Sequence, residues 1–306
     1  MNIISVDHGN SAIKTSNFMF ASALNKHSAK PPLAGDILEY DGSYWSLSGQ
    51  RIPYMMDKTS DESFFILTLF AIAKELLHNG NVAPHVEIDL ATGLPPEHFT
   101  IMRSKFAEYF KRDAVRIVYN GTAILLKINR VFVYPQAFAA ATPQADSLLS
   151  TPRVFIIDIG GYTTDLLLLK NGRPDLEFCR SFETGVITMS NEIIGKVNAQ
   201  HGIKLVEDQI TAVLRGDTNL CLMDDVIATI RTMAREHLKR IIDGLRENMV
   251  ELKANPAIFI GGGSILFKPY IVESPMIVKA DFILDPKANA IGYKMLATQQ
   301  LRTTSV

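Results

Sequence analysis

The feature that most constrains the fold of this chain is a strand that runs into an aspartate-glycine turn, and it occurs twice. Apolar residues 3–6 predict a first strand, which ends in a turn that begins at Asp7, and the alternation in 12–18 predicts a second strand. About 150 residues further on, apolar residues 154–157 lead into a glycine-rich turn over 158–164, followed by another strand. This self-similarity predicts a duplicated domain.

The length of the chain agrees with a duplication. At 306 residues it exceeds what one hydrophobic core usually serves, so we expect two domains of roughly 150 residues each. Domain I is predicted over 1–150, with a small inserted subdomain at about 30–60 that is rich in Pro, Gly, Tyr and Asp. Domain II is predicted over 151–306, with a helical subdomain at about 185–250 and a C-terminal helix that returns to domain I.

Hydrophobic periodicity predicts helices and strands in alternation, which is typical of the α/β class. The predicted helices cover about 61–78, 96–111, 186–200, 206–215, 223–251 and 286–300, with a short one at 136–141. The clearest further strands are predicted at 86–92 and 257–260.

Composition excludes several classes of function. Lys plus Arg number 31 against 32 Asp plus Glu, so the chain has no overall positive field to hold DNA directly. Cys179 and Cys221 lack the spacing of a zinc site, and they favour a reducing, cytoplasmic location. The N-terminus does not resemble a signal peptide, and the apolar run 64–73 is far shorter than the roughly 20 residues that cross a bilayer. We therefore expect no membrane contact.

The first turn has the residues of a phosphate site. Gly9 lets the backbone approach a phosphate closely, Asn10 and its neighbours supply donors, and Lys14 adds positive charge. Because the Asp7 carboxylate would repel phosphate, its presence predicts Mg²⁺ held partly through water. The alternative is a plain hairpin turn with a solvated Lys14, in which His8 only sets the shape of the turn.

The second turn repeats this chemistry with a carboxylate first, glycines next and hydroxyls after. Asp158 is followed by Gly160-Gly161 and then by Tyr162 and Thr163. Two such turns on duplicated domains are suited to clamp the β- and γ-phosphates of a nucleotide. The alternative is that the glycines only make a hairpin, which leaves Asp158 and the hydroxyls unexplained.

A glycine triplet, Gly261-Gly262-Gly263, follows the predicted strand 257–260. Three glycines remove the side chains where a flat base or a ribose could lie against the backbone. A glycine-rich structural turn is the alternative, since such turns are common.

In this order and at this separation, the three elements resemble the actin, heat-shock chaperone and sugar kinase superfamily over essentially the whole chain. The resemblance implies two duplicated actin-like (ribonuclease H-like) domains with a nucleotide cleft between them. It identifies residues 7–14 as phosphate motif 1, 158–165 as phosphate motif 2 and 261–264 as the adenosine motif. The first connecting motif then falls at Pro135-Gln136-Ala137, and the second at 288–293.

The resemblance also implies roles for individual residues. Gln136 is expected to position the attacking water, with Asp158 and Asp7 completing the catalytic set and serving as the Mg²⁺ residues. The residues expected to bind the nucleotide are Gly9, Asn10, Ser11, Lys14, Gly160, Gly161, Tyr162, Thr163, Gly185, Gly261, Gly262, Gly263 and Ser264.

Residues 185–189 and the helices after them resemble the plasmid-segregation actins of the ParM type and related archaeal actin-like proteins. This implies a filament-forming hydrolase of ATP or GTP that assembles with itself and reaches plasmid DNA through a separate DNA-binding adaptor. Fold does not fix function, so a small-molecule kinase acting on pantothenate, acetate or a sugar is the alternative. A nucleotide-binding scaffold without turnover is a third reading.

Overall fold

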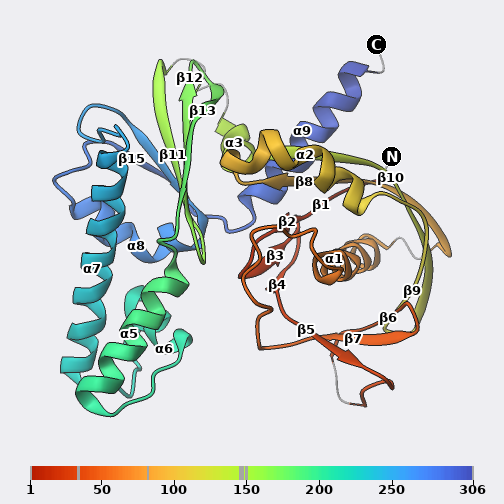
Figure 1. Ribbon diagram of the computed structural model, residues 1–306, viewed down its shortest axis with the longest axis horizontal. Coiled ribbons are helices and arrows are strands. Elements are labelled where there is room, and N and C mark those ends of the chain that lie inside the picture. The colour runs from red at the N-terminus through yellow and green to blue at the C-terminus, as the bar shows by residue number, and fades with distance from the viewer. Residues whose placement is uncertain (1, 33–34, 81–82, 145–147, 149–150, 305–306) are drawn as a thin grey trace. The chain divides into compact units, whose positions relative to one another are not determined.

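The computed structural model describes residues 2–32, 35–80, 83–144, 148 and 151–304. The chain divides into two compact units (Figure 1). Unit 1 contains Met1–Pro143 together with Lys287–Val306, and unit 2 contains Gln144–Pro286.

Unit 1 contains a mixed sheet of seven strands in the order β1-β8-β10-β9-β6-β7-β5. The strand pairs β1–β8 and β8–β10 are parallel, and the remaining neighbours are antiparallel. The carboxyl ends of β1, β8 and β10 therefore lie at one edge of this sheet. The bounds are β1 Ile3–Ser5, β5 Leu24–His27, β6 Ile37–Tyr40, β7 Ser43–Leu47, β8 His85–Leu94, β9 Arg112–Tyr119 and β10 Thr122–Pro135.

A second sheet of unit 1 is a small antiparallel one, β2-β3-β4. Its strands are Asp7–His8, Ala12–Lys14 and Met19–Ala21. Residues 12–18, expected to form one strand, are divided because Thr15 and Asn17 turn the chain and both donate to the buried Glu75 carboxylate.

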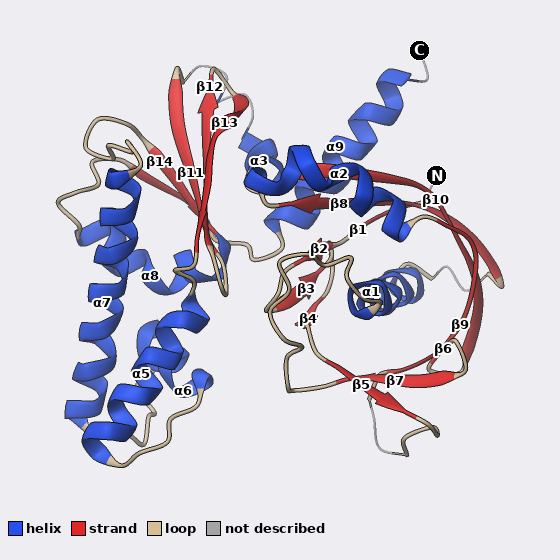
Figure 2. Cartoon of the chain, in the orientation of Figure 1, coloured by secondary structure: helices blue, strands red, loops and turns tan. Residues whose placement is uncertain are grey.

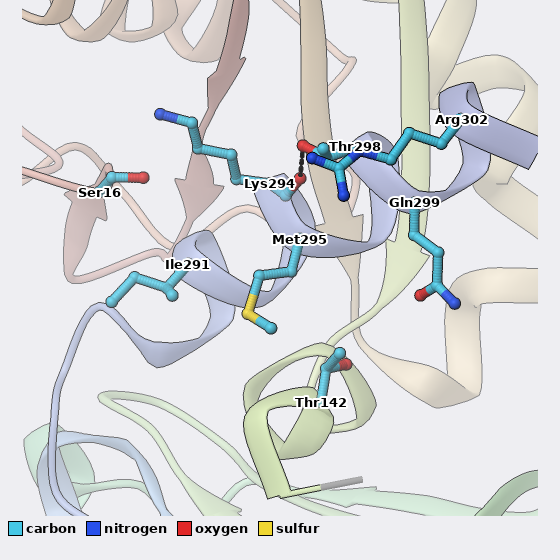
Figure 3. A pocket seen from close by; sticks show the side chains of 8 residues that line it. All are labelled: Ser16, Thr142, Ile291, Lys294, Met295, Thr298, Gln299 and Arg302. Atoms are coloured by element: carbon cyan, nitrogen blue, oxygen red, sulfur yellow. Dashed lines mark hydrogen bonds between the residues drawn. The ribbon is translucent and has the colours of Figure 1, made fainter.

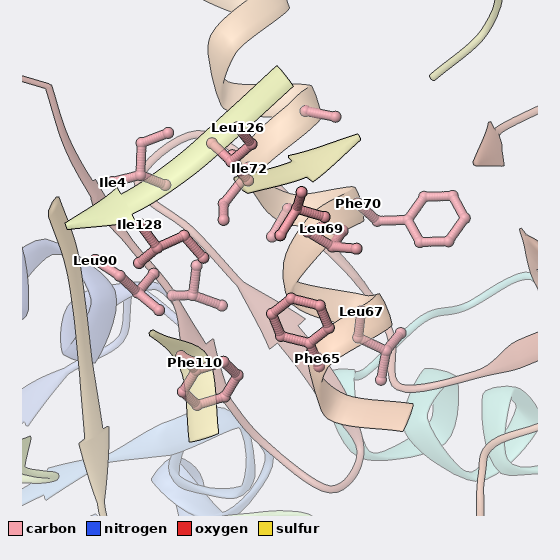
Figure 4. Packing of buried hydrophobic residues seen from close by; sticks show 14 of the residues in the cluster. Ile4, Phe65, Leu67, Leu69, Phe70, Ile72, Leu90, Phe110, Leu126 and Ile128 are labelled. Carbon is pink, nitrogen blue, oxygen red and sulfur yellow. The ribbon is translucent and has the colours of Figure 1, made fainter. Parts of the chain in front are cut away.

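Helix α1 (Ser63–His78) forms the centre of the unit 1 core. Its residues from Phe64 to Ala73 are all buried, as expected for a helix that is apolar on every side. Figure 2 shows α1 lying within the curve of the strands. Figure 4 shows Phe65 and Leu69 of this helix among side chains of the sheet such as Leu90 and Ile128.

Other helical segments in the described part of unit 1 include the last helix, α9 (Ala288–Thr304). A Cβ on Gly292 would lie 1.8 Å from the Ala139 carbonyl oxygen, and one on Gly93 would lie 2.3 Å from the Tyr293 hydroxyl. Glycine at these two positions therefore allows α9 to approach α3 and β8 closely. The other segments are α2 (Pro96–Phe110) and α3 (Phe138–Ala141), with a 3-10 turn at Thr142–Gln144.

Unit 2 has a five-stranded sheet in the order β13-β12-β11-β14-β15. Strands β11, β14 and β15 are parallel to one another, whereas β12 and β13 are antiparallel to their neighbours. The central strand β11 contains the continuous apolar run 154–157, and all four residues are buried, as expected for a strand covered on both faces. The bounds are β11 Arg153–Ile159, β12 Thr164–Lys170, β13 Arg173–Phe182, β14 Ala257–Ile260 and β15 Ala280–Ile283.

Among the described residues 151–286 of unit 2, the helices are α5 (Val186–His201), α6 (Glu207–Arg215), α7 (Asp224–Glu247) and α8 (Gly261–Glu273). Helix α7 is amphipathic, and its buried residues recur at three- and four-residue spacing from Val226 to Leu245. These residues join Phe155 and Phe259 of the sheet in the core of unit 2. No helix in the described part of the chain is long and apolar enough to cross a membrane.

Most predicted elements are confirmed within a few residues at their ends. Two predictions differ in kind. The short helix expected at 136–141 begins only at Phe138, so Gln136 lies before it. The glycine triplet, for which a structural turn was the alternative interpretation, is the first turn of helix α8. The backbone can pass directly from strand β14 into helix α8 because glycine can adopt the φ of +86° that Gly261 requires.

Candidate functional site

Asp7 and Gln136 meet in unit 1 because the strands before them are held in one parallel sheet. Asp7 follows β1 and Gln136 follows β10, and both strands flank β8. The Gln136 side-chain amide donates to Asp7 Oδ1 at 3.0 Å. These two residues, 129 positions apart, were predicted to serve one site, and the fold brings them into direct contact.

The Asp7 carboxylate is 2% exposed and also accepts from Lys14. Lys14 Nζ lies 3.1 Å from Asp7 Oδ2, and the two residues face each other across the β2–β3 hairpin. An ionised carboxylate has about four acceptor positions. Asp7 can therefore keep these two bonds and still accept further hydrogen bonds, and the water-mediated magnesium contact expected of it stays a prediction.

The turn after Asp7 is held from outside by side chains. A Cβ on Gly9 would lie 2.7 Å from the Ala12 carbonyl oxygen, so only glycine fits without a shift. The Ser22 hydroxyl donates to the Gly9 carbonyl oxygen. Asn10 Oδ1 accepts from the Met55 backbone N–H at 3.1 Å. The Asn10 side chain therefore orders the chain after β7, and its contact with a phosphate stays a prediction, as does that of Ser11.

His8 has a larger part in this turn than sequence reasoning assigned. Its ring is buried between two hydroxyls, with Nε2 2.7 Å from Thr68 Oγ1 and Nδ1 2.8 Å from Thr92 Oγ1. The Thr68 hydroxyl donates to the Phe64 carbonyl, so it accepts from His8 Nε2–H. Burial lowers the pKa of His8 well below its usual value, and the nearby Lys58 lowers it further.

Lys58 is a second residue that sequence reasoning did not find. It is 6% exposed, and its ammonium group donates to the His8 backbone carbonyl. No local pattern separates Lys58 from a solvated surface lysine, because its contact with the turn spans 50 residues.

The segment after Gln136 is held by the last helix of the chain. The Gln136 backbone N–H donates to the Leu94 carbonyl at 2.8 Å, and Ala137 has a φ of +65°. Such a conformation is strained for a residue with a Cβ. The Ala137 N–H donates to Asn289 Oδ1 at 2.9 Å. Asn289 lies within the segment expected as the second connecting motif, and it supports the backbone on which Gln136 is carried.

In unit 2 the turn over residues 160–163 joins β11 to β12, and Asp158 is the last residue but one of β11. Asp158 pairs with Asp165 across this hairpin, and the Gly160 N–H donates to the Thr163 carbonyl at 2.8 Å. Asp158 is 9% exposed. Asp165 accepts from the Ser181 and Thr163 hydroxyls.

The turn is also bound to the start of helix α5. The N–H groups of Gly185, Val186 and Ile187 donate to the carbonyls of Tyr162, Gly160 and Gly161, at 3.0, 3.1 and 2.7 Å. A Cβ on Gly185 would lie 2.3 Å from the Gly161 carbonyl oxygen. In the structure, the absence of a side chain at Gly185 lets α5 approach the turn closely. The contact with a nucleotide expected of Gly185 stays a prediction.

The glycine triplet lies beside Asp158 because β14 runs parallel to β11. A Cβ on Gly261 would lie 2.3 Å from Asp158 Oδ1, and one on Gly263 would lie 2.4 Å from Ile159 Cγ2. A Cβ on Gly262 would meet nothing within 4 Å. Since the triplet opens helix α8, it offers backbone N–H groups as well as a surface free of side chains. The Ser264 hydroxyl donates to the Ile260 carbonyl within this helix.

The predicted residues thus form two groups, one at the sheet edge of each unit. Among the described residues, no cluster of three or more His, Cys, Asp or Glu side chains could hold a metal ion. Any divalent ion therefore needs oxygens from water or from a ligand to complete its shell.

Unit 1 also has a cavity of about 580 Å³ along helix α9. Figure 3 shows Met295 and Ile291 of this helix lining it, with Thr142 opposite. None of the predicted site residues lines this cavity.

Comparison with protein families gives two matches in tandem. Residues 33–138 match the family described as the N-terminal domain of actin-like proteins. Residues 156–273 match the C-terminal domain of the archaeal actin homologue MreB-like family. The chain belongs to the actin-like superfamily. Comparison of this actin-like protein with curated sequences gave no significant match.

Solved structures agree on the fold of this actin-like protein. The archaeal actin homologue Ta0583 superposes with a TM-score of 0.80 at 20% identity, covering 98% of this chain and 100% of the other. The same homologue in complex with ADP gives a TM-score of 0.77 at 20% identity, with the same coverage. A ParM from a 15-stranded filament of Clostridium botulinum gives 0.74 at 19% identity, covering 98% and 100%. Bacillus thuringiensis ParM with ATP gives 0.69 at 13% identity, covering 98% and 100%.

Proposed function

We propose that this actin-like protein is a nucleotide-dependent, filament-forming ATPase that acts in plasmid DNA segregation. The observation that carries the proposal is that each unit ends an apolar strand in an aspartate-glycine turn suited to phosphate, in a chain whose fold matches a homologue solved with ADP. The nucleotide is ATP or GTP, together with Mg²⁺.

The two turns are proposed to bind the phosphates by different means. In unit 1, Lys14 supplies positive charge, and the backbone around Gly9, Asn10 and Ser11 approaches the phosphate oxygens. In unit 2, the turn over Gly160, Gly161, Tyr162 and Thr163 takes this part, with Gly185 supporting it.

The glycine triplet is proposed to hold the nucleoside. The space above Gly262 is open, and a helix begins there, so a ribose or base can lie against the backbone without a side chain in its way. Ser264 belongs to the same helical turn.

Asp7 and Asp158 are proposed to hold Mg²⁺ through its water shell. When bound, the ion would neutralise charge that develops on the phosphate oxygens. The residues fit this task because both are nearly buried carboxylates at the carboxyl ends of strands, and Asp158 lies across the hairpin from a second carboxylate, Asp165.

Gln136 is proposed to orient the attacking water. One N–H of its amide is bound to Asp7 Oδ1, which fixes the plane of the amide. The amide also carries a second N–H and an oxygen, the donor and acceptor needed to direct a water molecule.

The proposed partners are further copies of this chain and a DNA-binding adaptor, with the protein in the cytoplasm. A head-to-tail contact that does not close into a ring extends as an open helix, and ParM of Clostridium botulinum forms a 15-stranded filament. The balance of 31 basic and 32 acidic residues argues against direct DNA binding and favours an adaptor.

Light scattering after addition of nucleotide and Mg²⁺ tests the proposal. We expect assembly above a critical concentration at ~10 to 50 µM protein, the range suited to a weak repeated contact, with phosphate release that follows polymer mass. Negative-stain images of the same sample should show filaments. Monomers or closed dimers alone would contradict filament formation.

A panel of acceptors separates this function from a kinase. Pantothenate, acetate and sugars should leave phosphate release unchanged, because water is the proposed acceptor. Strong stimulation by one of them, with transfer of phosphate to it, would overturn the ATPase proposal in favour of a kinase.

A further inference from the structure

His237 lies in the middle of helix α7, and its hydrogen bonds fix its protonation state. It is 1% exposed. The Arg240 guanidinium lies 2.9 Å from His237 Nδ1, and His237 Nε2 lies 3.0 Å from the Thr184 carbonyl oxygen. Because arginine only donates and a carbonyl only accepts, Nδ1 is the acceptor and Nε2 carries the hydrogen.

The carbonyl that His237 contacts lies next to the proposed phosphate turn of unit 2. The Thr184 carbonyl also accepts from the Thr164 hydroxyl, at 3.1 Å, at the first residue of β12. Directly after it, Gly185 begins the three backbone hydrogen bonds that bind α5 to the carbonyls of residues 160–162. His237 therefore fixes the peptide unit from which those donors start.

The ring of His237 is itself held from two other helices. It stacks on Phe267 of α8, with 5.9 Å between the ring centres and an interplanar angle of 12°. Arg240, which donates to the ring, is paired with the Glu192 carboxylate of α5. The imidazole thus connects α7, α8 and the start of α5, and both α8 and α5 begin at proposed nucleotide-binding glycines.

We propose that His237 is a positioning residue for the nucleotide turn of unit 2: its Nε2–H holds the Thr184 carbonyl, and through it the turn over residues 158–165. The inference rests on the proposed function. A buried histidine that only fills space would need its shape and not its donor, and this difference can be measured.

Two substitutions separate the donor from the shape. His237→Gln keeps an N–H at nearly the position of Nε2, whereas His237→Leu fills a similar volume without a donor. Leu245→Ala in the same helix serves as the control, because it lowers the stability of the unit 2 core without touching the turn.

Two measurements are made on the full-length variants. The first is hydrogen exchange of the Gly185, Val186 and Ile187 amides without nucleotide, and the second is the affinity for Mg²⁺-ATP by calorimetry. His237→Leu should speed exchange and weaken binding by up to roughly 10-fold each, the factor expected for the loss of one buried hydrogen bond, since the Thr164 hydroxyl still donates to the Thr184 carbonyl. His237→Gln should recover most of both losses. Leu245→Ala should not speed the exchange of these three amides more than that of other amides in unit 2.

The inference is overturned if His237→Gln and His237→Leu behave alike, or if His237→Leu changes the three amides no more than Leu245→Ala does. If the parent chain binds no Mg²⁺ complex of ATP, ADP, GTP or GDP, the proposed function fails. The exchange measurement then still decides whether His237 positions the turn, because it needs no nucleotide.

Discussion

The two aspartate-glycine turns of this protein begin alike and are supported differently. In the strand register, Asp7 lies opposite Lys14 across the hairpin of unit 1, and Asp158 lies opposite Asp165 across the hairpin of unit 2. The first turn is held by side chains that come from far along the chain, among them Lys58 and Gln136. The second is held by backbone hydrogen bonds to helix α5.

The difference in charge suggests that the two turns contribute unequally to Mg²⁺ binding. Lys14 forms an ion pair with Asp7, whereas Asp158 and Asp165 occupy opposite positions of the second hairpin. Opposed carboxylates favour a cation between or near them. We therefore expect Asp158 to contribute more than Asp7 to Mg²⁺ affinity.

The difference in support predicts which substitutions each turn tolerates. A turn held by backbone bonds depends on close approach and therefore on glycine, whereas a turn held by side chains depends on particular functional groups. The following predictions address this comparison, beginning with the largest effect.

Gly185→Ala should be the most damaging single change. Its Cβ would lie 2.3 Å from the Gly161 carbonyl oxygen and 2.4 Å from the Tyr162 carbonyl carbon, and backbone atoms cannot move aside as a flexible side chain can. We expect a loss of about 3 kcal/mol in the free energy of unfolding, measured by urea titration. Gly195→Ala in the same helix is the control, because its Cβ meets nothing within 4 Å and should stabilise the helix by about 0.5 to 1 kcal/mol. Equal stability of the two variants would contradict close packing at Gly185.

Acid should destabilise the support of the first turn through His8. Its pKa is lowered in the folded chain by burial and by Lys58, so the unfolded chain binds the proton more readily. The free energy of unfolding should therefore fall as pH drops from about 6.5 towards the folded pKa, with a slope approaching about 1.4 kcal/mol per pH unit for this residue.

The measurement is urea unfolding at a series of pH values for the parent and for His8→Gln, which cannot titrate. The difference between the two slopes isolates the contribution of His8. Parallel slopes between pH 6.5 and 5 would show that folding does not lower the pKa of His8. That result would contradict the burial of the ring between Thr68 and Thr92.

Gln136→Ala should separate binding from hydrolysis. Without the amide, the attacking water loses its orientation, and turnover should fall by ~10-fold or more. Nucleotide affinity should change little because Lys14 still holds Asp7. Phosphate release and filament lifetime, measured on one preparation, check this, and filaments of the variant should outlast those of the parent. Hydrolysis at the parental rate would remove Gln136 from the catalytic set.

Gly262→Ala should have the smallest effect on folding. Its Cβ would meet nothing within 4 Å, so the free energy of unfolding should stay within about 0.5 kcal/mol of the parent. If the nucleoside lies against this glycine, the affinity for Mg²⁺-ATP should nevertheless fall. Gly263→Ala is the matched contrast, since its Cβ would collide with Ile159 and should destabilise the fold itself. Unchanged affinity for Mg²⁺-ATP in Gly262→Ala would show that the nucleoside does not lie against this glycine.

Local sequence patterns were sufficient for most of the elements that carry the proposed site. The strand 257–260 was predicted with the bounds it has, and the helices at 186–201 and 207–215 were predicted to within one residue. Apolar periodicity and glycine placement are properties of neighbouring residues, so they can be read without knowing the rest of the fold.

The identity of the first residue in each turn was also evident from the sequence. Asp7 and Asp158 stand at the ends of apolar strands, where a carboxylate has no packing reason to be. The start of helix α8 at the glycine triplet was missed because glycine is a poor helix former and is typical of turns.

Only the tertiary structure decided which distant residues support the turns. His8 lies between Thr68 and Thr92, Lys58 reaches the His8 carbonyl, and Asn289 holds Ala137 across 152 positions. Each of these residues looks ordinary in its local sequence, since a buried lysine or a bonded asparagine has no periodic signature. Their contacts depend on the order and register of strands in the sheet, which long-range packing sets and no short segment of the chain contains.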